Sequence, residues 1–83
     1  MGRKTREQEG FVGNRVEEFR TAANLSRAQL AEIVGVNFQT IGYIERFEYS
    51  PSLALAFKLS KALDTTVDQL FTYEGVASRE QEE

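Results

Sequence analysis

Short helical segments, each preceded by a residue that caps helices, follow one another through the middle of the chain and constrain its fold more than any other feature. Ser26 and Gln29 have the spacing of a capping box, in which the two side chains bond reciprocally to the backbone at the start of a helix. Asn37 stands in the same place before the next amphipathic segment, and Thr66 with Gln69 repeats the capping-box spacing. Helices this short are unstable alone, so they must pack together.

These signals delimit five helices and leave no segment with the alternating pattern of a strand. The expected helices cover residues 14–23, 26–35, 37–46, 52–63 and 67–71, and Asn24 is the expected stop of the first. Both ends of the chain are polar and lack periodicity. The sequence therefore predicts an all-α domain. Its parts are a flexible arm over residues 1–13, the domain over residues 14–73 and an acidic flexible tail over residues 74–83.

The composition excludes several classes of function. The chain of 83 residues has no cysteine and no histidine, which removes disulfides, thiolate metal sites and imidazole acid–base chemistry. No combination of a nucleophile with a base is apparent, so we expect no enzymatic activity, no metal and no cofactor. No apolar run approaches the roughly 20 residues that span a bilayer, and we expect a soluble, cytoplasmic protein.

The net charge of −3 does not by itself indicate a nucleic-acid partner, but the charge is unevenly distributed. The acidic excess lies in the tail, which has four glutamates and one basic residue, Arg79. The middle of the chain is nearly neutral. Local patches therefore decide the choice of partner more than the total charge does.

The segment from Asn37 to Arg46 has an apolar face and an unusual outer face. On a helical wheel, Asn37 and Glu45 lie on the side of Ile41 and Ile44, whereas the far side carries Gln39, Gly42, Tyr43 and Arg46. A glycine inside a helix costs about 1 kcal/mol relative to alanine, and close approach of another surface is a good reason for having one. Two short helices joined at VGVN, the second with such a face, match the helix-turn-helix plan for entering the DNA major groove.

The stretch LSRAQLAEIVGVNFQTIGYIERFEYSPSLALAFKLSKAL resembles the Cro and phage-repressor helix-turn-helix proteins, often called the XRE family. The resemblance covers roughly residues 14–71 and combines the framework LS...LA..VGV...TI..IE with YSPSL.LA.KL.KAL. It implies a five-helix, lambda-repressor-like DNA-binding domain that regulates transcription. It further implies a homodimer, most simply a repressor, that binds a pseudo-palindromic site in double-stranded DNA.

The resemblance places the base-reading positions at Phe38, Gln39 and Tyr43. A glutamine can bond bidentately to adenine, a tyrosine can donate to an acceptor edge, and a phenylalanine can pack on a thymine methyl group. For Phe38, partial burial against the preceding helix is an open alternative. The remaining candidate DNA contacts are Arg27, to a phosphate or an outer base, Asn37 and the amides beside it, to a phosphate, and Gly42, Arg46 and Tyr49.

Two further expectations, an internal ion pair and an unusual turn, follow from the same resemblance. Arg20 and Glu45 correspond to an internal salt bridge, which agrees with the inward direction of Glu45 on the wheel. Phe47 stands where the family commonly has a glycine in the left-handed conformation, and a bulky residue is unusual there. Either the turn is rebuilt or Phe47 has gained a use, in packing or on DNA.

Other functions stay open at this point. A helical adaptor could present the same outer face to a protein, and an antitoxin-type autoregulator would combine both roles. The expected helix over residues 52–63 is apolar nearly all round, which favours a dimer interface in the C-terminal half, although simple core packing is the alternative for each residue.

Overall fold

A computed structural model describes residues 10–74, and these form five helices and two strands. In chain order they are β1 (Phe11–Asn14), α2 (Val16–Ala22), α3 (Arg27–Val34), α4 (Phe38–Glu45), α5 (Leu53–Ala62), α6 (Val67–Leu70) and β2 (Phe71–Glu74). The five expected helices are confirmed, with ends within two residues of the expected ones. Among the described residues, no helix has the length and apolarity needed to cross a membrane.

Side-chain caps start three of the helices, and the sequence predicts the first two of them. Ser26 Oγ accepts from the Gln29 amide at 3.0 Å, and Gln29 Oε1 accepts from the Ser26 amide at 2.7 Å, which completes the capping box. The Asn37 side chain caps α4 by accepting from the amide of Gln39, and the Ser52 hydroxyl accepts from an amide of α5.

The predicted capping box at α6 is wrong. Thr66 is the residue before the helix, but its side chain makes no capping hydrogen bond. The neighbouring Thr65 hydroxyl instead donates to Oε1 of Gln69 at 3.0 Å, so the glutamine side chain is directed to Thr65. The four-residue helix is held through its buried Leu70, whose carbonyl accepts from the Arg15 amide at 2.9 Å.

Helices α2 to α5 each end at a residue in the left-handed conformation. Asn24, the predicted stop of α2, has φ of 60°, Gly35 has 78°, and Asp64 has 57° after α5. Phe47 follows α4 with φ of 63°, and the amides of Phe47 and Glu48 donate to carbonyls of the last turn of α4. This is a complete Schellman closure, so the family's turn is kept although its usual glycine is absent.

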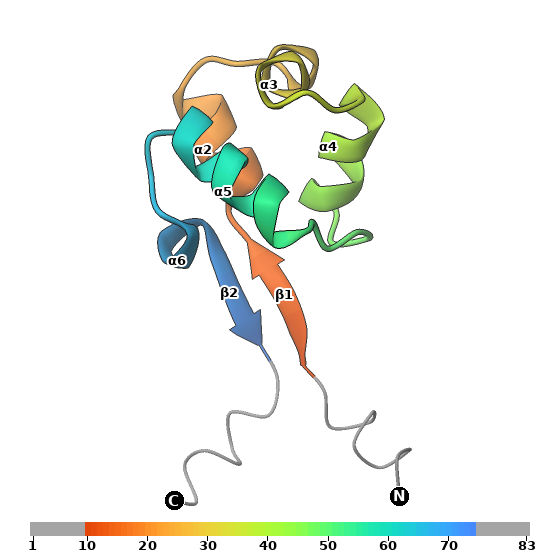
Figure 1. Ribbon diagram of the computed structural model, residues 1–83, viewed down its shortest axis with the longest axis vertical. Helices are drawn as coiled ribbons and strands as arrows, with labels where there is room; N and C mark the ends of the chain where they lie inside the picture. The colour runs from red at the N-terminus through yellow and green to blue at the C-terminus, as the bar shows by residue number, and fades with distance from the viewer. Residues whose placement is uncertain (1–9, 75–83) are drawn as a thin grey trace, which may run out of the picture.

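One hydrophobic core joins the five helices. Helix α3 packs against α4 and α5, and α2 contacts α4, with α3 at the end of the molecule away from the sheet (Figure 1). Every helix contributes at least one fully buried side chain. These are Val16, Leu30, Ile41, Ile44, Leu59 and Leu70. The core therefore fixes α4 against α3, which sets the geometry of the helix-turn-helix.

The sequence prediction of no strand is wrong. β1 and β2 form a two-stranded antiparallel sheet in which Phe11 lies opposite Glu74 and Asn14 opposite Phe71. It extends from the helical body on the side away from α3 (Figure 1). Residues 11–13, which the sequence assigned to the flexible arm, belong to this sheet. The rest of the predicted arm up to residue 9, and the tail from residue 75, lie outside the described residues.

The Asn14 side chain joins the sheet to α4. Its Nδ2 donates to the carbonyl of Ile44 at 2.9 Å, and its Oδ1 accepts from the Val16 amide at 3.0 Å. One side chain therefore ends β1, starts α2 and satisfies a carbonyl near the end of α4.

Candidate nucleic-acid interface

The two sides of α4 separate as the helical wheel predicts. Ile41 and Ile44 are fully buried, and Glu45 is buried beside them. Gln39, Tyr43 and Arg46 are exposed. Because the buried isoleucines anchor the helix, its exposed side is held as a rigid surface.

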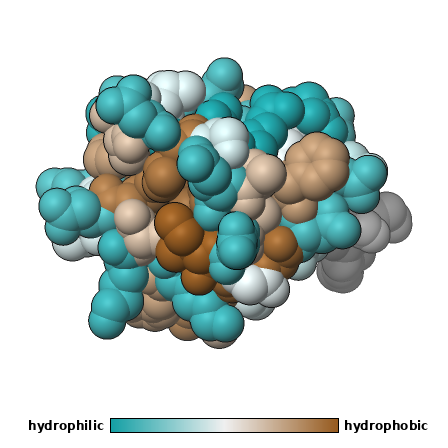
Figure 2. Space-filling model, turned by 90° about the horizontal axis from the view of Figure 1, so that it is seen from above, coloured by the Kyte–Doolittle hydropathy of each residue, from teal (hydrophilic) through white to brown (hydrophobic). Residues whose placement is uncertain are grey.

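A shallow hollow brings together most of the predicted DNA contacts. It lies between the start of α3 and the exposed side of α4, and its lining consists of Arg27, Phe38, Gln39, Gly42, Tyr43 and Arg46. Seen from the end of the molecule where α3 lies, hydrophilic residues surround a smaller group of hydrophobic ones (Figure 2). DNA offers phosphates, polar base edges and thymine methyl groups, and a mixed surface can match all three.

The Phe38 side chain is 56% exposed, in the lining of this hollow. A little under half of the residue is covered, as the alternative of partial burial expects, and the rest is open in the hollow that Phe38 lines with Arg27 of α3.

Gly42 is not the exposed position that the sequence predicted. It is buried, and two guanidinium groups cover it. A Cβ atom placed on Gly42 would lie 3.1 Å from Nη1 of Arg46 and 3.6 Å from Nη1 of Arg27. The missing side chain makes room for arginines of the protein itself.

The predicted pair of Arg20 and Glu45 is confirmed. Arg20 donates from Nε at 2.6 Å and from Nη2 at 3.2 Å, and its Nη1 donates to the carbonyl of Leu25. The hydrogen bond to Glu45 raises the pKa of Arg20 above its ordinary value, against the opposing effect of burial. The guanidinium thus links α2, the turn before α3 and the end of α4.

Glu45 also binds Arg27, which the sequence did not predict. Arg27 Nε lies 2.9 Å from Glu45 Oε1, so one carboxylate receives both arginines. The Glu45 side chain is only 1% exposed, whereas that of Arg27 is 39% exposed. The carboxylate is thus in the core, and Arg27 extends from it towards solvent.

The other predicted contacts lie at the two ends of α4. Asn37 uses its side-chain oxygen as the cap of the helix. Arg46 lies over the Tyr43 ring at 5.3 Å and 3.4 Å from Glu48, and both partners of that ion pair are well exposed. Tyr49 lines a second hollow, with Thr40, Tyr43 and Glu48. The two hollows share Tyr43, so it connects the residues around Arg27 with Tyr49.

The comparisons with known proteins agree with this geometry. A family model described as "Helix-turn-helix" matches residues 16–70, which spans α2 to α6. The chain belongs to this helix-turn-helix family. Relatives named as HTH-type transcriptional regulators and as a control protein agree with the family's role, and this helix-turn-helix protein is a DNA-binding transcriptional regulator whose family implies binding of double-stranded DNA. The expected lambda-repressor-like, XRE-type fold is likewise confirmed.

Individual relatives of this helix-turn-helix protein include two control proteins. The control protein C.SmaI of Serratia marcescens is 38% identical over 70 residues, which cover 84% of this chain and 83% of the relative. An HTH-type transcriptional regulator of Archaeoglobus fulgidus is 35% identical over 60 residues, covering 72% and 84%. The crystal structure of the restriction-modification controller protein C.AhdI from Aeromonas hydrophila superposes with a TM-score of 0.63 at 36% identity, covering 66% of this chain and 83% of that chain.

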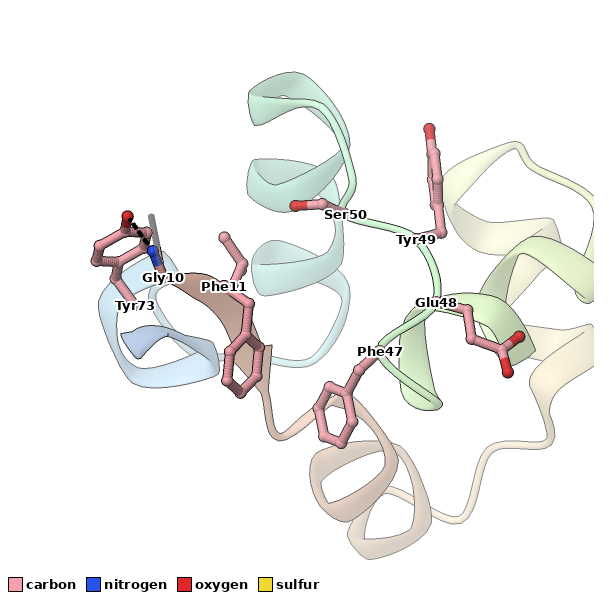
Figure 3. A pocket seen from close by; sticks show the side chains of 8 residues that line it. Gly10, Phe11, Phe47, Glu48, Tyr49, Ser50 and Tyr73 are labelled. Carbon is pink, nitrogen blue, oxygen red and sulfur yellow. Dashed lines mark hydrogen bonds between the residues drawn. The ribbon is translucent and has the colours of Figure 1, made fainter. Parts of the chain in front are cut away.

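This helix-turn-helix protein departs from the family pattern at Phe47, and the structure shows both the strain and the use. The residue has left-handed φ, and its ring packs edge-on against Phe11 of β1 with 6.4 Å between centroids (Figure 3). Tyr73 of β2 accepts from the Gly10 amide beside them at 2.9 Å. Phe47 therefore joins the end of α4 to the sheet. The sequence held no sign of Phe11 and Tyr73 here, because their contact depends on the unpredicted strands.

Proposed function

We propose that this protein is a dimeric repressor that reads the major groove of a pseudo-palindromic operator with α4. The observation that carries the proposal is the exposure of Gln39 and Tyr43 on the side of α4 that faces away from the core. In a helix-turn-helix domain, the residues near the start of the second helix contact base edges. Gln39 lies in the first turn of α4 and Tyr43 one turn further on.

The contacts divide by chemistry into two groups. Gln39, Tyr43 and Phe38 read bases, because an amide, a hydroxyl and an aromatic ring suit adenine, an acceptor edge and a thymine methyl group. Phosphates are bound by the cations, by amides at the start of α4 and by the segment at Tyr49 that follows the helix. That second group comprises Arg27, Asn37, Arg46 and Tyr49. Gly42 contributes by the space it leaves rather than by direct approach of DNA.

The homodimer forms through α5 in this proposal. Leu53 and Phe57 are one helical turn apart, on the same side of α5, and are 68% and 55% exposed. Two large apolar side chains on one side of a helix favour a protein interface. The two copies of α4 would then lie about 34 Å apart, which matches one turn of DNA.

A second, narrower candidate is control of a restriction–modification system. Its support is the similarity to C.SmaI and to C.AhdI, a control protein and a restriction-modification controller protein. Genes for a nuclease and a methyltransferase beside the gene for this chain would favour it. A toxin gene there would favour an antitoxin-type autoregulator instead. We expect no enzymatic activity in either case, and action in the cytoplasm with the DNA.

A salt-titrated binding assay tests DNA binding against the adaptor alternative. Neutralising phosphates releases counterions, so the logarithm of the association constant should fall linearly with the logarithm of salt concentration. Duplexes selected from a random pool should be bound far more tightly than scrambled ones. Affinity for a protein partner with no salt-dependent binding to any duplex would support the adaptor.

Sedimentation equilibrium tests the dimer. Wild type should be a dimer at tens of micromolar, and Phe57→Asp should be a monomer because a charge cannot be buried unpaired in the interface. Ile33→Asp is the matched control, since Ile33 is an equally exposed apolar residue on α3. A wild-type monomer with and without duplex, or dissociation by both substitutions, would contradict an interface on α5.

A further inference from the structure

Two arginines from different helices meet above Gly42. Arg27 comes from the first residue of α3 and Arg46 from the end of α4, yet both guanidinium groups lie within 4 Å of the point where a Cβ atom of residue 42 would stand. Two like charges this close repel each other unless something neutralises them. The arrangement therefore needs an explanation.

Glu45 neutralises part of this charge from below. Its buried carboxylate accepts from Arg20 and Arg27, so it shares one negative charge between two positive ones. Within residues 10–74, the acidic partner of Arg46 is Glu48, at 3.4 Å and in solvent, where an ion pair contributes little. Three arginines and two glutamates make up the cluster, which leaves a net charge of +1 at the exposed end.

The unused donors of both arginines point to an anion. Among the described residues, Arg27 donates to a side chain only through Nε, and Arg46 does likewise. The Nη groups of both remain available above Gly42, and planar guanidinium groups suit the oxygens of a phosphate. The hollow that holds them also contains Gln39 and Tyr43, so an anion there would sit beside the base-reading residues.

We infer that Arg27 and Arg46 form a two-arginine site above Gly42 that binds a phosphate of the DNA backbone, with Glu45 as the residue that positions Arg27. The inference deepens the proposed function and rests on it. Gly42 then contributes to affinity, because a Cβ atom there would crowd the Arg46 guanidinium, 3.1 Å away, and shift it from the site. The glycine makes room for the Arg46 guanidinium and makes the helix less stable than alanine would.

Gly42→Ala separates this role from a structural one, because stability and affinity should change in opposite directions. Alanine is favoured over glycine inside a helix, and the nearby atom belongs to the flexible end of a side chain, so Tm should rise by about 4 °C. DNA affinity should fall by about tenfold as Arg46 is displaced, for selected and scrambled duplexes together. The salt slope should fall by about one per subunit.

Double substitutions provide the controls. In an Arg46→Ala background, Gly42→Ala should have no further effect on DNA affinity. In an Arg27→Ala background, Glu45→Gln should likewise have no further effect on DNA affinity. Unchanged affinity in Gly42→Ala, or a loss that persists without Arg46, would overturn the site. So would a loss confined to the selected duplex, because a base contact would then be responsible. If wild type binds no duplex, the proposed function itself is wrong. If wild type binds DNA but the substitutions do not have the expected effects, the proposed function stands and the two-arginine site is wrong.

Discussion

The two sides of α4 carry different chemistry within one helix of eight residues. The inner side has Ile41, Ile44 and Glu45, all buried, and its single charge is bound by two arginines. The outer side has Gln39 and Tyr43, which are exposed and make no side-chain hydrogen bond to another described side chain. The difference teaches that the inner side determines where the helix sits, while the outer side is left available for a partner.

The largest expected effect is on the inner side. Glu45→Ala should lower the free energy of unfolding by about 3–5 kcal/mol, because Arg20 would be left buried without its partner. Chemical denaturation monitored by circular dichroism measures this. A loss below about 1 kcal/mol would mean that the pair behaves like a surface ion pair, and the contrast between the two sides would disappear.

Arg27→Ala should affect binding more than folding. It removes the more exposed partner of Glu45 and leaves the Arg20 pair intact, so the loss of stability should stay below about 1 kcal/mol. Selected and scrambled duplexes should both be bound about tenfold more weakly, since a charge-assisted phosphate contact carries no sequence information. Unfolding and binding measured on one preparation check this. A variant that loses several kcal/mol of stability but binds DNA normally would show that Arg27 stabilises the fold and does not contact DNA.

Phe47→Gly extends the comparison to the end of α4, where the Phe47 ring contacts Phe11 of β1. Relief of left-handed strain should stabilise the fold by about 1 kcal/mol, but loss of the ring contact with Phe11 opposes it by about 0.5–1.5 kcal/mol. The net change in wild type should therefore be small. In a Phe11→Ala background the contact is already lost, and Phe47→Gly should then raise the free energy of unfolding by the full amount. A fall in Tm in both backgrounds would show that strain at Phe47 is negligible.

The parts of the fold that local chemistry determines could be predicted from the sequence. Ser26 with Gln29, and Asn37, cap helices through bonds to residues two or three positions away, so their spacing is enough. The direction of Glu45 followed from helical periodicity. The capping box at Thr66 failed because a competing local bond, from Thr65 to Gln69, uses the same side chain.

The parts that depend on distant residues could not be predicted. The strands are four residues each and pair across almost the whole chain, so neither carries a recognisable pattern alone. The same limit applies to the interface. A wheel indicates that Glu45 points inward and Gly42 outward, but it does not show that Arg27 and Arg46 fold over the glycine. These contacts are set by how α3 packs on α4.

The most direct measurement of the central claim is selection of preferred sites from random duplexes by wild type and by Gln39→Ala. If the outer side of α4 reads bases, Gln39→Ala should lose the preference at one base pair of each half-site, with a penalty of about 1–3 kcal/mol on the wild-type site. Binding to scrambled duplexes and the free energy of unfolding should stay unchanged. An identical selected site for both proteins would contradict the claim, and the outer side of α4 would then be a surface for a protein partner.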